Sequence, residues 1–177
     1  MIEERGVRIR RATRDDLLFL VELVTDDDVQ PFLGGGGAFD AEGIEEELAR
    51  QEREPEAFGR FVIEVLEDGE WAGAGAMGFK RANERSRIAH LERLAIHPRF
   101  RGRRLADDAA RLLQRHLIFE LDYHRVQMEI YGFNERAQRH AERSGFVREG
   151  VRRKAYWRHG EWTDGVIYGL VREDLEQ

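Results

Sequence analysis

The chain has 177 residues, no cysteine and a formal net charge of −6, and charged residues make up 36% of it. At roughly 150 residues per domain, this length predicts one domain over residues 1–177. The lack of cysteine excludes disulfides, thiolate metal ligands and a cysteine nucleophile. The sequence contains no apolar run of about eighteen residues and no apolar signal core near its start, so we expect a cytoplasmic protein without a membrane span.

Hydrophobic periodicity and turn residues predict the elements in chain order. Thr13 and Asp16 form a capping pattern ahead of the first helix, and Asp40 is expected to cap the second. A loop is expected over residues 26–37, and Asp68-Gly69 predicts a tight hairpin. Strands are predicted at 7–12, 60–66, 71–79, 88–96, 126–131, 147–156 and 162–171, and helices at about 14–25, 40–53, 104–117 and 134–144. This order predicts a mixed α/β (α+β) domain built on one sheet.

An arginine-rich turn is the most informative segment of the sequence. A predicted strand ends at Pro98, four arginines follow between residues 99 and 104, and a helix begins near Arg103 or Arg104. The free amides and positive dipole of a helix start bind anions, and arginine adds charge and bidentate hydrogen bonds. Such a turn suits a pyrophosphate, and a solvated basic loop is the alternative interpretation.

The turn also resembles the acetyl-CoA site of the GNAT (general N-acetyltransferase) superfamily, whose pattern is Arg/Gln-x-x-Gly-x-Gly/Ala. Arg101-Gly102-Arg103-Arg104-Leu105-Ala106 matches this pattern at Arg101 and Ala106 and departs from it at Arg104, where the family has glycine. Residues 134–146 resemble the family's later helix, which begins Asn-x-x-Ala/Ser and ends Glu-Lys-x-Gly-Phe. Residues 149–164 are similar to the branch that acetylates ribosomal-protein N-termini, polyamines and some antibiotics.

The resemblance implies a single mixed, mostly antiparallel sheet with a splayed central strand pair and helices on both faces. It further implies acetyl-CoA as co-substrate, with the backbone of Leu94 and Ile96 on the pantetheine arm. Asn134 would contact the pantetheine or the amine, although an ordinary helix N-cap is the alternative. The pyrophosphate would be held by the amides of Arg101, Gly102, Arg103, Arg104, Leu105 and Ala106.

The general base is expected on the strand before the turn. Strand alternation predicts that His90, Glu92, Leu94 and Ile96 share one face, and relatives place a glutamate or histidine base on this strand. We expect Glu92 to be the base, with His90 as the second candidate. The alternative for each is a strand-edge charge paired with an arginine.

The leaving-group side departs from the family pattern. Many relatives have a tyrosine at the position of Ala141, which protonates the departing thiolate of CoA. In this chain Tyr131 or His140 would take over that role, or backbone dipoles would stabilise the thiolate while water supplies the proton. Arg104 would crowd the phosphate, since glycine allows closer backbone approach; at an ordinary helical position it would instead point outward or grip the phosphate.

These features predict an acetyl-CoA-dependent N-acetyltransferase acting on a primary amine: a protein N-terminus, a polyamine or an aminoglycoside-like molecule. The alternative is a catalytically inactive acyl-CoA-binding domain. The chain lacks a metal-binding motif, and its net negative charge argues against nucleic-acid binding. A homodimer through the last strands is plausible. A cationic amine is expected to be attracted by Asp26, Asp27, Asp28, Glu45 and Glu46.

Overall fold

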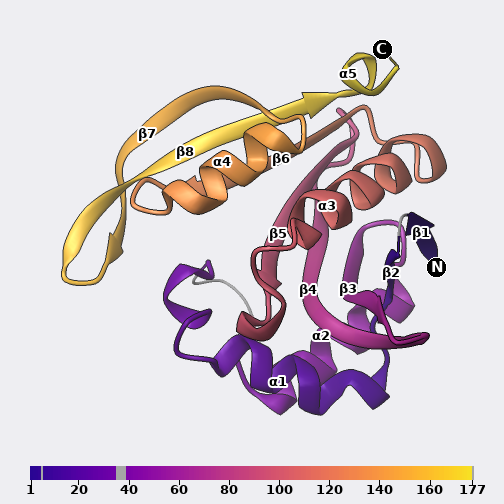
Figure 1. Ribbon diagram of the computed structural model, residues 1–177. Coiled ribbons are helices and arrows are strands. Elements are labelled where there is room, and N and C mark those ends of the chain that lie inside the picture. The colour runs from indigo at the N-terminus through magenta and orange to yellow at the C-terminus, as the bar shows by residue number, and fades with distance from the viewer. Residues whose placement is uncertain (5, 35–38, 177) are drawn as a thin grey trace.

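The computed structural model describes residues 1–4, 6–34 and 39–176 (Figure 1). These residues form one eight-stranded sheet in the order β1-β2-β3-β4-β5-β6-β8-β7. Neighbouring strands are antiparallel except β5 and β6, which are parallel. The strands are β1 (Ile2–Glu4), β2 (Val7–Arg11), β3 (Phe58–Glu67), β4 (Glu70–Asn83), β5 (Ile88–Ile96), β6 (Arg125–Tyr131), β7 (Val147–Arg158) and β8 (Glu161–Val171).

Helices cover both faces of the sheet, as predicted. One face carries α1 (Leu17–Thr25) and α2 (Ala41–Arg53), and the other carries α3 (Leu105–Arg115) and α4 (Glu135–Arg143) (Figure 1). No helix within the described residues is both long and apolar enough to cross a membrane. The remaining helical turns are Arg14–Asp16, Gln30–Phe32, Pro98–Phe100, His116–Glu120 and α5 (Arg172–Leu175).

The sheet separates two apolar clusters. The larger lies under α3 and α4 and includes Phe79, Leu113 and Tyr168, while the smaller lies under α1 and α2 and includes Leu20 and Ile44. Each of these five side chains is fully buried. Because each cluster fills the space between a sheet face and its helices, the strands between them are held from both sides.

The predicted splayed strand pair is confirmed at the centre of the sheet. Strands β5 and β6 pair only at Ile88 with Arg125, Ala89 with Val126, and His90 with Gln127. Beyond His90 the two strands diverge (Figure 1). The second half of β5 therefore presents its β6-facing edge to an opening.

The predicted elements are all present, with small shifts at their ends. The Asp40 carboxylate accepts the Gly43 amide at 2.9 Å and caps α2, and Asp68 and Gly69 turn the β3–β4 hairpin with φ values of 51° and 87°. Two elements were not predicted, β1 and α5, because three or four residues are too short to display a period. The part of the predicted loop at residues 35–37 lies outside the described residues.

Candidate active site

A cavity of about 570 Å³ occupies the opening between β5 and β6. Its wall is built from β5, Lys80 of β4, the arginine-rich turn, the start of α3, β6, one side of α4, Tyr156 of β7 and lining residues between positions 29 and 34. The structure therefore brings most of the predicted site residues to one place. The predicted residues that line the cavity are His90, Glu92, Leu94, Ile96, Arg101, Gly102, Arg104, Leu105, Ala106 and Asn134.

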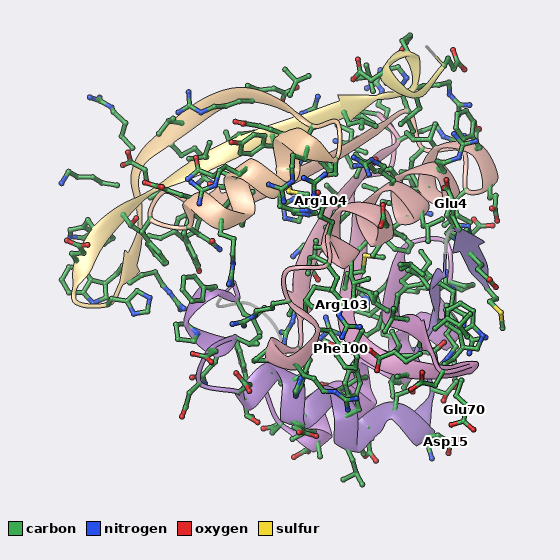
Figure 2. The ribbon with its side chains drawn as sticks, viewed as in Figure 1. Glu4, Asp15, Glu70, Phe100, Arg103 and Arg104 are labelled. Carbon is green, nitrogen blue, oxygen red and sulfur yellow. The ribbon has the colours of Figure 1, made fainter. Side chains whose placement is uncertain are left out.

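Arg103 is the predicted site residue whose side chain points elsewhere. Its guanidinium forms an ion pair with Glu67 at the end of β3 and lies 5.5 Å from the centre of the Phe100 ring. Figure 2 shows Arg103 beside Phe100, whereas Arg104 lies nearer to α4. The expected role of Arg103 is therefore limited to its backbone amide.

A β-bulge interrupts β5 inside the cavity. Ala95 pairs with Ala76 and Glu92 pairs with Gly78, so Arg93 and Leu94 together face the single residue between them on β4. Arg93 has a φ of 55°, in the left-handed region. An extra residue of this kind resets the alternation of side chains along the strand.

The bulge overturns the prediction that His90, Glu92, Leu94 and Ile96 share one face. Leu94 and Ile96 pack against the cluster under α3. Glu92 lies on the opposite face, where its charge acts on Arg60 and Arg93 near Glu47 of α2. Nothing in the sequence marked the bulge, because neither glycine nor asparagine occupies the left-handed position.

The turn before α3 has two residues in the left-handed region. Gly102 has a φ of 82°, and Arg104, the N-cap of α3, has φ 59° and ψ 18°. Position 104 is therefore not an ordinary helical one, and its conformation explains why a glycine is favoured there. Among the described residues Arg104 has no ion-pair partner. Its charge is free to meet an anion at the helix start.

Glu92 is held in an ion pair at the cavity wall. Its Oε2 lies 2.7 Å from Nζ of Lys80, and its side chain is 21% exposed. His90 lies opposite Lys80 in the β4–β5 register. Burial, with a further contribution from Lys80, lowers the pKa of His90 below its ordinary value. His90 is therefore neutral at pH 7 and able to accept a proton.

Glu129 and Tyr156 are site residues that the sequence analysis missed. Glu129 accepts a hydrogen bond from Arg152 Nη1 at 3.0 Å and another from the Tyr156 hydroxyl. Burial and this carboxylate raise the pKa of Tyr156. Alternation along β6 could have indicated Glu129, because Val126, Met128 and Ile130 face the core under α3.

Asp107, His140 and Arg143 join α3 to α4 beside the cavity. Oδ1 of Asp107 lies 2.7 Å from Nδ1 of His140, and Oδ2 lies 2.7 Å from Nε of Arg143. Burial opposes the charge of Asp107, but the hydrogen bonds from Arg143 and His140 hold its pKa below the ordinary range. Burial lowers the pKa of His140, so its neutral ring donates Nδ1–H to Asp107 and leaves Nε2 without a hydrogen.

Asn134 is an N-cap, as the alternative interpretation had it. Its Oδ1 accepts the Ala137 amide at 3.1 Å, and the residue also lines the cavity. Ala141 is fully buried in the cluster under α3, away from the cavity wall. Both suggested substitutes for a tyrosine there, Tyr131 and His140, do line the cavity.

The acidic side chains expected to attract a cationic amine do not line the cavity, although Asp28 lies beside it, where its backbone oxygen accepts a hydrogen bond from Arg101 at 3.0 Å. The cavity wall includes carboxylates from β5, β6 and α3. It does not include any of the five residues named from the sequence, which are Asp26, Asp27, Asp28, Glu45 and Glu46. Attraction of an amine by these carboxylates stays a prediction, because charges act beyond direct contact.

Comparisons with known proteins agree on a family and a fold. The profile of the acetyltransferase (GNAT) domain matches residues 7–147. The SPbeta prophage-derived N-acetyltransferase YokL of Bacillus subtilis, which is uncharacterized, is 34% identical over 83 residues, a segment spanning 47% of each chain. The chain thus aligns with about half the length of this curated relative.

Two solved structures share the whole fold at low sequence identity. Spermidine N-acetyltransferase from Vibrio cholerae, crystallised with CoA and spermine, superposes with a TM-score of 0.84 at 20% identity and covers 97% of this chain and 99% of its own. Ribosomal-protein-S5-alanine acetyltransferase from Vibrio fischeri has a TM-score of 0.82 at 16% identity and covers 97% and 96%. At these identities the likeness extends to the fold.

Proposed function

The chain belongs to the acetyltransferase (GNAT) family, and from that premise we propose that it transfers the acetyl group of acetyl-CoA to a primary amine in a ternary complex. One observation carries the proposal: a single cavity joins the arginine-rich turn to a group of titratable side chains that includes two carboxylates and a histidine. The arginine-rich turn lies at one end. The other end, which we call the acceptor end, is lined by Lys80, His90, Glu92, Glu129 and Tyr156.

The residues around the turn fit a CoA pyrophosphate. Gly102 and Arg104 are both left-handed, and Arg104 brings an unpaired charge to the start of α3. A helix start supplies free amides and a positive dipole end to such a group. Leu94 and Ile96 would bind the pantetheine arm through backbone groups that β6 leaves unpaired, and Asn134 lines the same cavity. When bound, acetyl-CoA supplies an acetyl thioester.

Glu92 is the proposed general base. An incoming ammonium can replace Lys80 as the cation next to this carboxylate, which sits 2.7 Å from Lys80 Nζ. Glu92 then takes a proton from the nitrogen, directly or through one water, so that the lone pair can attack the thioester carbon. His90, two residues earlier on β5 and neutral at pH 7, is the second acceptor for that proton.

Tyr131 is the proposed proton donor to the departing thiolate. His140 lines the same cavity, but its neutral ring gives the Nδ1 proton to Asp107 and carries none on Nε2. A group in that state accepts hydrogen bonds and does not donate a proton. The Tyr131 hydroxyl is a hydrogen-bond donor that lines the same cavity, and it can give its proton to the sulfur as the sulfur leaves.

The test is thiol release from acetyl-CoA with the wild type and Glu92→Gln, against a protein N-terminal peptide, a polyamine, an aminoglycoside and simple monoamines. We expect at least one amine to drive release, and Glu92→Gln to lower kcat by about 10²-fold, the scale of a positioned base. Glu120→Gln is the matched control, because Glu120 is an exposed carboxylate bound to a histidine in a helical turn.

Calorimetry with acetyl-CoA distinguishes the two ways in which this test can fail. Binding of acetyl-CoA without amine-dependent thiol release would overturn the transferase proposal in favour of an inactive acyl-CoA-binding domain. An absence of binding would contradict the assignment of the turn. The cytoplasmic location and the homodimer stay predictions.

A further inference from the structure

Four aromatic rings form a continuous row along the cavity, from residues 29–34 to the acceptor end, and three of them, Phe32, Tyr131 and Tyr156, line it. Phe32 and Phe133 lie 6.1 Å apart between ring centres, Phe133 stacks on Tyr131 at 5.4 Å, and Tyr131 meets Tyr156 edge-on at 5.2 Å. The row ends at Glu129, which binds the Tyr156 hydroxyl. Phe32 and Phe133 are 41% and 38% exposed. Exposed aromatic rings grouped beside a cavity are typical of a surface that binds an apolar partner.

Arginine side chains already cover three rings of this row. Guanidinium carbons lie 5.6 Å from the centre of the Phe32 ring (Arg136), 5.1 Å from Tyr131 (Arg158) and 5.8 Å from Tyr156 (Arg152). A cationic ligand is held by such rings only where their faces are free. The row is therefore suited to an uncharged aromatic group and unfavourable to an additional cation.

The carboxylates of the acceptor end are each matched by a cation. Glu92 pairs with Lys80 at 2.7 Å and Glu129 with Arg152 at 3.0 Å. The acidic residues of the 26–28 and 45–46 segments do not line the cavity. One ammonium can take the place of Lys80 at Glu92, but a second or third would meet no unpaired carboxylate among the lining residues the structure describes.

From these contacts we infer that the preferred acceptor is a primary monoamine carried on an aromatic body, and that polyamines are poor acceptors. This inference rests on the proposed acetyltransferase function. The ammonium would lie at Glu92, and the aromatic body would lie along Phe32, Phe133 and Tyr131. The acetyl group passes from the thioester sulfur to the amine nitrogen, Glu92 or His90 takes the amine proton, and Tyr131 protonates the sulfur.

The first test compares kcat/KM of the wild type for phenethylamine, butylamine, putrescine and spermidine, measured as thiol release. Phenethylamine and butylamine carry the same single charge, so their ratio isolates the aromatic body. We expect phenethylamine to exceed butylamine by about 10-fold, the equivalent of 1.4 kcal/mol for an aromatic contact. Spermidine is expected to be slowest. Thiol release that is fastest with spermidine would overturn this inference while supporting the transferase proposal.

Phe32→Ala tests the aromatic row directly. Phe32 lies on an exposed helical turn, so its loss should leave the fold intact. We expect kcat/KM for phenethylamine to fall about 10-fold and that for butylamine to change less than about twofold. Phe119→Ala is the matched control, because Phe119 is also 41% exposed and also has an arginine over its ring. An equal loss with both amines would contradict the proposed role of the row.

Arg152→Gln tests whether spermidine is a poor acceptor because the carboxylates of the acceptor end are already paired. This substitution should improve spermidine as an acceptor. Removing this guanidinium leaves Glu129 without its ion-pair partner, so kcat/KM for spermidine should rise up to about fivefold, the range of an ion pair near the surface. The matched control is Arg139→Gln, which removes a similarly exposed arginine from its pair with Glu135, a residue that does not line the cavity. An unchanged spermidine rate in Arg152→Gln would overturn the charge argument. Failure of every amine in the wild type would instead overturn the transferase proposal itself.

Discussion

Asp107 near the start of α3 and His140 near the end of α4 are joined by a 2.7 Å contact between Oδ1 and Nδ1. Both side chains are more than nine-tenths buried, at 3% and 9% exposure. Arg143 completes the contact from the solvent side. This link fixes the spacing of two helices that frame the cavity.

Asp107→Asn should lower the free energy of unfolding by about 2 kcal/mol, because a buried carboxylate loses charge-assisted hydrogen bonds. Chemical denaturation followed by circular dichroism measures the change. Asp108→Asn provides the control, since its pair with Arg111 is partly exposed and is worth about 0.5 kcal/mol. Equal losses in the two variants would show that the Asp107 link is not special.

Stability should fall as the pH is lowered through the histidine range. Burial lowers the pKa of His90 and His140 in the folded state. Below the unfolded pKa of about 6.5, the unfolded chain binds protons that the folded chain does not. The free energy of unfolding therefore decreases from pH 7 towards pH 5. Denaturation across this range is expected to show a shallower slope in His140→Gln than in the wild type, and an equal slope in the two proteins would contradict the role of His140.

Arg104→Gly and Arg104→Ala separate backbone strain from charge. Glycine relieves the left-handed conformation, so Arg104→Gly should be more stable than Arg104→Ala by about 1 kcal/mol. Both variants lose the guanidinium, and each should weaken acetyl-CoA binding about tenfold, as measured by calorimetry. Tighter binding in the glycine variant would mean that Arg104 crowds the phosphate instead of gripping it.

Tyr131→Phe should lower kcat by up to about 10²-fold, the lower end for a positioned acid, because a thiolate needs less assistance than a stronger base. The KM for acetyl-CoA should change little. His140→Gln is the comparison, since it keeps a donor towards Asp107 and is expected to retain most of kcat. A larger loss of kcat in His140→Gln than in Tyr131→Phe would mean that His140, and not Tyr131, donates the proton to the thiolate.

The sequence predicts the architecture well because periodic apolar residues and turn signals act locally. The caps at Asp40 and Thr13 and the Asp68-Gly69 turn form as expected. The faces of β5 are predicted wrongly, because the bulge at Arg93 depends on packing against Phe39 and Glu47, which are distant in the chain. For the same reason the Glu129–Arg152–Tyr156 group appears only once β6 and β7 lie on the same side of the cavity.

The divergence of β5 from β6 has a consequence for hydrogen exchange. Residues 88–90 share a ladder with β6, but the following half of β5 has one open edge. Amides on that edge should exchange with deuterium readily in the free protein, because they have no hydrogen-bond partner on β6. A pantetheine arm laid along Leu94 and Ile96 would act as a substitute strand. Exchange there should slow when CoA is added, and exchange at residues 88–90 should stay the same.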